Sequence, residues 1–260
     1  MRVDDFDFEL PPERIAQAPA VPRDAARLLH VAETLADRTV RELPDLMAPG
    51  DALVVNDTKV LPCRLTGRRG QAKIEVTLHK PLGPAVWLTF ARPASKLKAE
   101  DVIDFAPGFT AVVIGKREAG EVELDFNVSG PDLMTALEAH GVMPLPPYIK
   151  RNAAGDDADR STYQTLFAAR PGAAAAPTAG LHFTDDLMAT LAARGVTVVT
   201  LTLHVGAGTF LPVKVDDTAG HVMHAEWADL DAAAAETLNA TRAAGGRITA
   251  VGSTALRTLE

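Results

Sequence analysis

The strongest structural signal in the chain is the stretch Leu201-Thr202-Leu203-His204-Val205-Gly206-Ala207-Gly208-Thr209-Phe210-Leu211-Pro212-Val213. A β-branched, apolar run that begins at Val196 breaks here into two glycines around one alanine, and the chain then continues as an extended segment. Such a run predicts a strand that is buried on both faces. Glycine at positions 206 and 208 lets the backbone lie close to a ligand. Because ligands of open α/β sheets bind beyond the carboxyl ends of the strands, we expect a site at residues 204–209.

A second loop of small residues, from Pro171 to Thr184, comes just before that strand. We expect the two loops to form opposite walls of one site. His182 lies in the first loop and His204 in the second, where a side chain can face a cleft and act as an acid or a base. A purely structural role is the alternative for each histidine.

The composition is that of a soluble globular protein, with 47% hydrophobic and 23% charged residues among 260. This length suffices for one large domain or two ordinary ones. The single cysteine, Cys63, excludes an internal disulfide and favours a reducing compartment. The acidic start of the chain is not typical of a signal peptide, and no apolar run approaches the roughly 18 residues of a membrane span. We therefore expect a cytoplasmic protein.

The net charge of −8 argues against a general nucleic-acid coat protein, but the charge is unevenly distributed. The segment from Thr58 to Ile74 contains no acidic residue. Its basic residues are Lys59, Arg64, Arg68, Arg69 and Lys73. The segment is either the solvated surface of a strand or a local patch that contacts phosphates.

The hydrophobic period changes near Val60 and again near Ile149. Between these points, short runs alternate apolar and polar residues, as in a small antiparallel barrel. Outside them, helical and strand patterns alternate. We therefore predict an α/β domain formed by residues 1–59 and 150–260, with an inserted all-β, antiparallel barrel-like domain at residues 60–149.

Within the α/β domain, the sequence predicts a buried strand over residues 52–55 and a helix from Asp159 to Ala169. Thr184 and Asp231 are expected to cap two further helices. Ser253 or Thr254 is expected to cap one more, yet only residues 255–260 remain for it, too few for a stable helix. We therefore expect the carboxyl end of the α/β domain to be truncated.

Several common site types do not fit the sequence. The segment Gly206-Ala207-Gly208 is not a dinucleotide fingerprint, because Leu211 occupies the third glycine position and no P-loop occurs elsewhere. His221, His224 and Glu226 have the spacing of metal ligands, but no further ligand can be identified, so we expect no metal site. Covalent hydrolase chemistry has no support, because no serine or cysteine lies in a nucleophile elbow.

Seven segments resemble, in order and over the whole chain, the motifs of one enzyme family. They are DFDFELP (5–11), VNDTKVLPCRL (55–65), MPLPPYI (143–149), YQT (163–165), PGAAAAPTAGLHFT (171–184), LHVGAGTFLPV (203–213) and HVMHAE (221–226). Together they closely resemble the S-adenosylmethionine:tRNA ribosyltransferase-isomerases of queuosine biosynthesis. Members of this family are longer and continue past the position of Glu260.

The resemblance implies transfer of the ribosyl part of S-adenosylmethionine to aminomethyl-deazaguanine at the tRNA wobble position. The ribosyl group is isomerised, which gives epoxyqueuosine and releases adenine and methionine. S-adenosylmethionine is then a co-substrate, and no prosthetic group or metal is needed. The family also implies an α/β domain that carries an inserted β-barrel, and tRNA as the partner of a chain that we expect to be monomeric.

On this basis His182 and His204 are the acid and base candidates, with Glu226 as a carboxylate alternative. The residues expected to bind S-adenosylmethionine are Asn56, Asp57, Thr178, Gly180, Gly206, Gly208 and Thr209. The residues expected to bind tRNA phosphates are Lys59, Arg64, Arg68, Lys150 and Arg151.

Two other hypotheses stay open. A non-catalytic RNA-binding module would use the basic β insertion, although only Trp87 and Phe90 offer stacking surfaces there. Alternatively, this chain is an inactive fragment of the enzyme. A different S-adenosylmethionine enzyme, such as a methyltransferase, would need an early glycine-rich strand–turn–helix that the sequence lacks.

Overall fold

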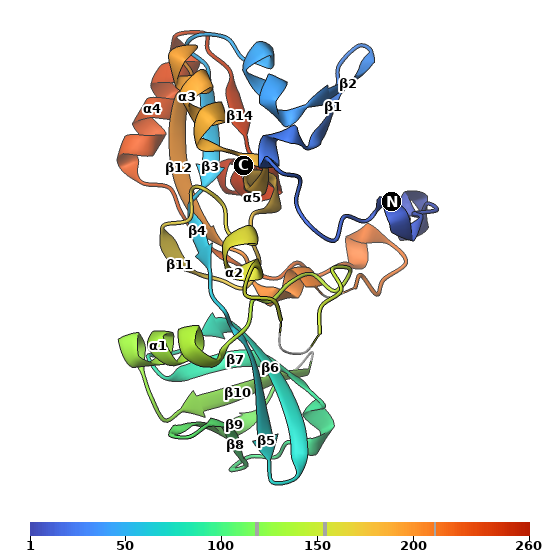
Figure 1. Cartoon of the computed structure of the whole chain (residues 1–260), viewed down its shortest axis with the longest axis vertical. Coiled ribbons are helices and arrows are strands. Elements are labelled where there is room, and N and C mark those ends of the chain that lie inside the picture. Colours follow the sequence, from blue (N-terminus) through green and yellow to red (C-terminus); the bar gives the residue numbers. More distant parts are fainter. Residues whose placement is uncertain (118–119, 153–154, 211) are drawn as a thin grey trace.

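The structure is a computed structural model that describes residues 1–117, 120–152, 155–210 and 212–260. Figure 1 shows a β-barrel at one end of the long axis and an α/β part at the other. Leu211, which occupies the third glycine position of a dinucleotide fingerprint, lies outside the described residues. No helix in the described part of the chain is both long and apolar enough to span a bilayer.

The α/β part is built on a mainly parallel sheet with strand order β13-β12-β3-β14. β3 (Ala52–Asn56) lies between β12 (Thr197–His204) and β14 (Ile248–Ala250) and is parallel to both, while β13 (Trp227–Asp229) pairs antiparallel with β12. Every residue of β3 is buried, which confirms the predicted strand. β12 is buried continuously only over residues 201–203, because Thr197 and Thr200 in its first half are exposed.

Helices cover both faces of this sheet because β3 presents apolar side chains alternately to each. Leu53 and Val55 pack with Leu187 and Leu191 of α3 (Asp185–Ala193). Ala52 and Val54 of β3 pack with α4 (Ala232–Ala243) and α5 (Gly252–Leu259). The predicted N-caps of α3 and α4 are confirmed. Thr184 Oγ1 accepts from the Leu187 amide at 3.2 Å and Asp231 Oδ1 from the Ala234 amide at 2.7 Å.

Two helix predictions are wrong in detail. α5 begins at Gly252, after Val251 and without a side-chain cap, rather than after Ser253 or Thr254. The helix predicted from Asp159 to Ala169 is the short α2 (Asp159–Thr162). The chain turns after α2, where Gln164 donates to the Val60 carbonyl at 2.7 Å and accepts from the Val60 amide at 3.1 Å. These tertiary hydrogen bonds outweigh helix propensity, which is weak by itself.

The inserted part is a closed antiparallel barrel with strand order β10-β7-β6-β5-β8-β9, as predicted. Its strands are β5 (Arg64–Arg69), β6 (Ala72–Pro81), β7 (Val86–Arg92), β8 (Val102–Ala106), β9 (Phe109–Lys116) and β10 (Glu121–Phe126). α1 (Gly130–His140) inserts Leu133 and Leu137 into the barrel core. All of these elements lie within the predicted insertion of residues 60–149, whose limits remain a prediction.

A short parallel pair joins the two parts. β4 (Thr58–Val60) follows β3 toward the barrel, and β11 (Arg170–Ala173) pairs with it. Farther from the barrel, β1 (Arg27–Val31) and β2 (Leu35–Thr39) form a hairpin. Because β4 and β11 run beside the carboxyl end of β12, they bring the two predicted loops next to the barrel (Figure 1).

Candidate functional site

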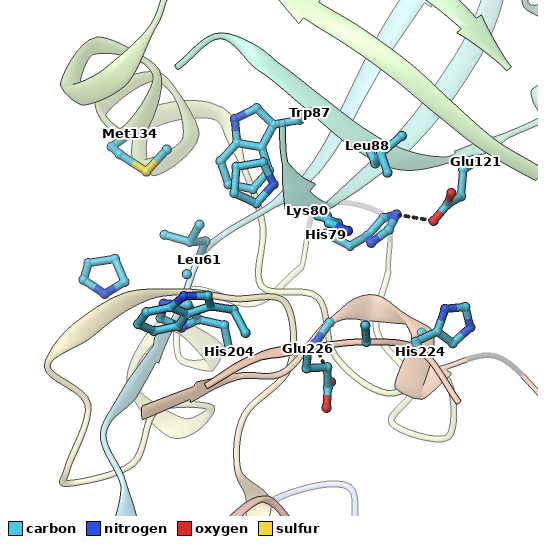
Figure 2. Close-up of a pocket in the computed structure, with 17 residues that line it drawn as sticks. Leu61, His79, Lys80, Trp87, Leu88, Glu121, Met134, His204, His224 and Glu226 are labelled. Atoms are coloured by element: carbon cyan, nitrogen blue, oxygen red, sulfur yellow. Dashed lines mark hydrogen bonds and ion pairs between the residues drawn. The ribbon is translucent and has the colours of Figure 1, made fainter. Parts of the chain in front are cut away.

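A cleft of about 690 Å³ lies between the barrel and the α/β part, and we call it the interdomain cleft. Its barrel wall consists of His79, Lys80, Pro81, Trp87, Leu88, Glu121 and Met134. Its α/β wall consists of Pro171, Gly172, His204, Gly206, Gly208 and residues 224–227, with Leu61 at the junction. Figure 2 shows His79 and Trp87 on one side of this space and His204 and Glu226 on the other.

His204 ends β12 and is fixed from several sides. Its Nδ1 lies 2.7 Å from Oγ1 of the buried Thr58, and its ring stacks on Trp227 with the centroids 4.9 Å apart. A Cβ at Gly172 would fall 2.6 Å from His204 Nε2, so the imidazole fits only because residue 172 has no side chain. The two predicted loops therefore do meet, through Gly172 and His204.

The surroundings of His204 favour the neutral form of its imidazole. Burial lowers its pKa, the charge of Arg170 lowers it further, and Asp57 opposes both effects. Arg170 lies with its Cζ 5.2 Å from the centre of the Trp227 ring and forms an ion pair with Asp229 at 2.7 Å. The Thr202 hydroxyl donates to Asp57 at 2.6 Å. The same Thr202 oxygen accepts a hydrogen bond from Arg170 at 3.1 Å. A neutral imidazole in a cleft can accept a proton from a ligand.

The barrel wall carries a second histidine that the sequence analysis did not identify. His79 stacks on Phe90 with the ring centroids 4.5 Å apart, and its Nε2 lies 3.1 Å from Glu121 Oε1. Burial, followed by the charges of His224 and Lys80, lowers the pKa of His79 to about 4. Apolar and polar residues alternate along β6, and His79 is one of the polar residues outside the barrel core. No pattern in the local sequence indicates that the α/β part covers this residue.

Glu226 holds the glycine bend in place. Its Oε1 accepts from the Gly206 amide at 2.9 Å, and its Oε2 accepts from Arg257 of α5 at 2.6 Å. Arg257 also donates to the His224 carbonyl at 3.0 Å, and a Cβ at Gly208 would fall 2.7 Å from the His224 ring. Both carboxylate oxygens of Glu226 are therefore already engaged within the protein.

The other residues expected to bind S-adenosylmethionine lie outside the interdomain cleft. The buried Asn56 pairs both ends of its amide with the backbone of Leu203, at 2.9 and 3.1 Å. Gly180 is buried, and a Cβ there would fall 3.0 Å from Thr165 Cγ2. Thr178 and Thr209 line a separate cavity of about 490 Å³.

His182 is separated from His204. It lines a pocket of about 240 Å³ together with Arg23 and Tyr148. Burial lowers the pKa of His182, and the charge of Arg23 lowers it further. The two histidines that the sequence analysis grouped therefore belong to different cavities.

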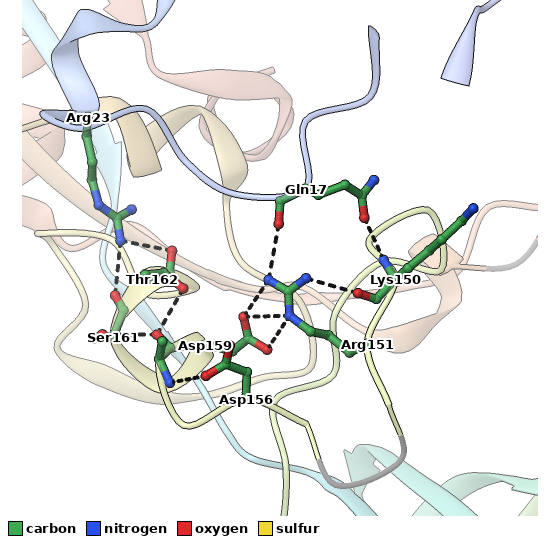
Figure 3. A network of polar contacts seen from close by, with 9 residues as sticks. Gln17, Arg23, Lys150, Arg151, Asp156, Asp159, Ser161 and Thr162 are labelled. Carbon is green, nitrogen blue, oxygen red and sulfur yellow. Dashed lines mark hydrogen bonds and ion pairs between the residues drawn. The ribbon is translucent and has the colours of Figure 1, made fainter. Parts of the chain in front are cut away.

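The basic residues expected to bind tRNA occupy different settings. Arg64 and Arg68 lie on β5, where the neighbouring Arg69 forms an ion pair with Asp101 at 2.9 Å. Arg151 forms an ion pair with the buried Asp159 at 3.0 Å, which raises the pKa of Arg151, and donates to the Gln17 carbonyl at 3.2 Å (Figure 3). Lys150 is exposed and Lys59 is half-buried. Arg151 thus ties the chain after the barrel to the amino-terminal segment.

A metal site is not found among the residues that the structure describes, since they contain no group of three or more His, Cys, Asp or Glu side chains placed to hold an ion.

Comparisons with known proteins agree with the resemblance found in the sequence. The family model described as queuosine biosynthesis protein matches residues 3–260. Relatives named S-adenosylmethionine:tRNA ribosyltransferase-isomerase include those of Rhodospirillum rubrum, 60% identical, and Maricaulis maris, 54% identical. These matches span 100% of this chain and 75% and 76% of the two relatives.

A crystal structure of S-adenosylmethionine tRNA ribosyltransferase from Thermotoga maritima is 32% identical, covers 98% of this chain and 72% of its own, and has a TM-score of 0.45. The family match and the identities over the full chain confirm the resemblance. The chain therefore belongs to the queuosine biosynthesis protein family, as a transferase and isomerase of the S-adenosylmethionine:tRNA ribosyltransferase-isomerase type.

Proposed function

We propose that this chain transfers the ribosyl part of S-adenosylmethionine to aminomethyl-deazaguanine at the wobble position of tRNA and isomerises it. The products are epoxyqueuosine, adenine and methionine. The observation that carries this proposal is 60% identity, over the full chain, to a protein named for the tRNA ribosyltransferase-isomerase activity. The interdomain cleft is the site that we propose for the reaction.

This chemistry needs a base that removes a carbon-bound proton beside the sulfonium and an acid that assists the departure of adenine. We assign the base to His204, because it lines the interdomain cleft, its surroundings favour the neutral imidazole, and Thr58 holds its Nδ1. Glu226 is less suited, since Gly206 and Arg257 occupy its two oxygens. His182 lines another pocket, so we do not assign it to this proton transfer.

The aromatic side chains of the interdomain cleft suit flat heterocycles. Trp87 and Trp227 line it from opposite walls, and stacking on such rings contributes about 1–3 kcal/mol per base. A wobble base must leave its stack to reach a recessed site. Lys59, Arg64, Arg68, Lys150 and Arg151 are the residues that we propose for the phosphates on either side.

Single-turnover reaction with S-adenosylmethionine and an anticodon stem-loop that carries aminomethyl-deazaguanine tests the proposal. We expect adenine and methionine to be released in equal amounts, together with epoxyqueuosine in the RNA. Binding of the stem-loop without release of adenine would instead support the RNA-binding module or the inactive fragment. The logarithm of the binding constant should fall linearly with the logarithm of the salt concentration. A shallower slope after Arg68→Ala would support the phosphate contacts.

A further inference from the structure

A β-bulge in β6 turns two adjacent residues toward the interdomain cleft. The register with β7 shifts between Leu78 and Lys80, which leaves His79 as an extra residue on β6. Adjacent residues of a regular strand point to opposite faces of the sheet, and a bulge changes the direction of a side chain. His79 and Lys80 accordingly both line the interdomain cleft.

Lys80 is a cation that has no partner. Among the described residues that line the interdomain cleft, it is the one lysine or arginine. It is exposed, and its ammonium forms no hydrogen bond or ion pair within the described part of the chain. Burial and then His224 lower the pKa of His79, and the charge of Lys80 lowers it further, so this charge acts on the space beside the His79 ring. Lys80 is therefore available to an anion in the cleft.

Glu121 is a carboxylate that has no cation. It begins β10, lines the same cleft, and its side chain is 18% exposed. Its neighbour His79 has a pKa of about 4 and is neutral near pH 7, and no lysine or arginine of the described ranges pairs with Glu121. The other carboxylate of the described lining, Glu226, already accepts from Gly206 and Arg257. Shielding a carboxylate from water costs free energy unless a cation offsets it, so Glu121 favours a cationic group of a ligand.

The neutral ring of His79 separates these two charges. Figure 2 shows Lys80 on one side of this ring and Glu121 on the other. Because β7 lies between β6 and β10, the two backbones are about 10 Å apart, twice the spacing of paired strands. The two charges therefore face the cleft without pairing with each other. This arrangement suits a ligand that carries an anionic and a cationic group close together.

We propose that Lys80 and Glu121 bind the amino-acid end of S-adenosylmethionine, Lys80 its carboxylate and Glu121 its ammonium. An α-amino acid carries both groups on one carbon, as one lysine and one glutamate across a narrow gap require. Trp87 pairs with Pro81, the residue after Lys80, so a nucleoside stacked on Trp87 lies next to this amino-acid site. The identity of the ligand rests on the proposed function. The two residues belong to the barrel, whereas the sequence analysis selected only residues of the α/β part for S-adenosylmethionine.

Two variants and two controls of the 260-residue chain test the assignment. Lys80→Met removes the ammonium and keeps an unbranched side chain, and Glu121→Gln removes the charge at nearly constant size. The controls, Lys73→Met and Glu75→Gln, change the same residue types on β6 outside the lining of the cleft. Since Glu121 has no cation to lose, we expect Glu121→Gln to unfold at a temperature no lower than the wild type. Lys80 is exposed, so Lys80→Met gives a folded test even if Glu121→Gln does not fold.

Titration calorimetry measures the binding of S-adenosylmethionine and of two analogues, one without the carboxylate and one without the amino group. We expect Lys80→Met to weaken binding of S-adenosylmethionine about three- to fivefold, as for an exposed ion pair. Glu121→Gln should weaken it about tenfold to a hundredfold, because this carboxylate is shielded from water. Lys80→Met should leave the affinity for the decarboxylated analogue unchanged, and Glu121→Gln that for the deaminated analogue. Both controls should bind as the wild type does.

The outcomes separate this site from the proposed function. Wild-type affinity of the folded variants for S-adenosylmethionine would overturn the amino-acid site, and so would a wild-type chain that does not bind S-adenosylmethionine. If Glu121→Gln loses as much affinity for the deaminated analogue, Glu121 contacts the sulfonium instead, and the assignment is wrong. A wild-type chain that binds S-adenosylmethionine, with weaker binding in both variants, but releases no adenine would support the amino-acid site and contradict the proposed function.

Discussion

The interdomain cleft has His79 on its barrel wall and His204 on its α/β wall, and the surroundings of these two histidines differ (Figure 2). His79 is held by its own barrel, stacked on Phe90 and beside Glu121, and its side chain is 10% exposed. His204 is held by residues from other segments of the α/β part, among them Thr58 and Trp227. The same residue type thus serves as a packed part of one wall and as a positioned, half-buried group on the other.

The electrostatics follow this difference. Burial first of all lowers the pKa of His79 to about 4, so this residue is neutral near pH 7 and is a poor base. Around His204 the lowering by burial and Arg170 is countered by Asp57. Asp57 thus limits the lowering of the pKa of His204, and a general base works best when its pKa is not far from the operating pH.

Replacing each histidine by glutamine gives the sharpest test of this comparison. We expect His204→Gln to slow single-turnover ribosyl transfer about 10²- to 10⁴-fold, the usual contribution of a general base. His79→Gln keeps a polar side chain of similar size, so we expect less than about a tenfold effect. Equal losses of rate in the two variants, with both folded, would contradict the assignment of different roles to His79 and His204.

Gly172→Ala disturbs the α/β wall while both histidines stay in the sequence. The new Cβ would fall 2.6 Å from His204 Nε2, so the imidazole must move, and a misplaced catalytic group costs about 10- to 100-fold in rate. Gly115→Ala on β9 is the matched control, because a Cβ there meets nothing within 4 Å. We expect the control to react at the wild-type rate. A Gly172→Ala enzyme that is equally fast would remove His204 from the mechanism.

The α/β wall was largely predictable because local sequence encodes it. The apolar run of β12 ends in glycines, and that pattern alone indicated a site around His204 and Gly206. The two loops meet at Gly172, however, and not at Gly180, which packs against Thr165. Which glycine of a loop makes the close approach depends on the path of the chain in three dimensions, and no spacing rule gives it.

The barrel wall was not predictable from the sequence. The alternation of apolar and polar residues along β6 puts Ile74, Val76 and Leu78 in the core and His79 on the outer face. Nothing in a strand pattern distinguishes an outer residue that faces solvent from one that faces a second domain. The same limit explains why His182 was grouped with His204 although they lie in different cavities.

The burial of His79 predicts how stability depends on pH. Because its pKa is about 4 in the folded protein and about 6.5 in the unfolded chain, the unfolded chain binds more protons between these values. Stability contributed by this residue is therefore constant above about pH 6.5 and falls as the pH drops toward 4. Over this range we expect the free energy of unfolding of His79→Gln to fall by about 2 kcal/mol less than that of the wild type. The difference is no larger because Glu121, at 3.1 Å, favours the charged form of His79. Urea unfolding at a series of pH values measures it, and parallel curves for the two proteins would contradict it.

The smallest effect concerns the charges that adjust His204. Removing the positive charge with Arg170→Gln should raise the pKa of His204, so the acid limb of the rate profile moves to higher pH and the rate at pH 5.5 falls about two- to fivefold. Arg170→Gln also breaks the ion pair with Asp229, so Asp229→Asn, which breaks the same pair but keeps the Arg170 charge, is its control. Asp57→Asn should move the limb the opposite way, because its charge raises this pKa. If all three variants keep the wild-type limb, the group that titrates in the reaction is not His204, and the contrast between the two walls has no bearing on proton transfer.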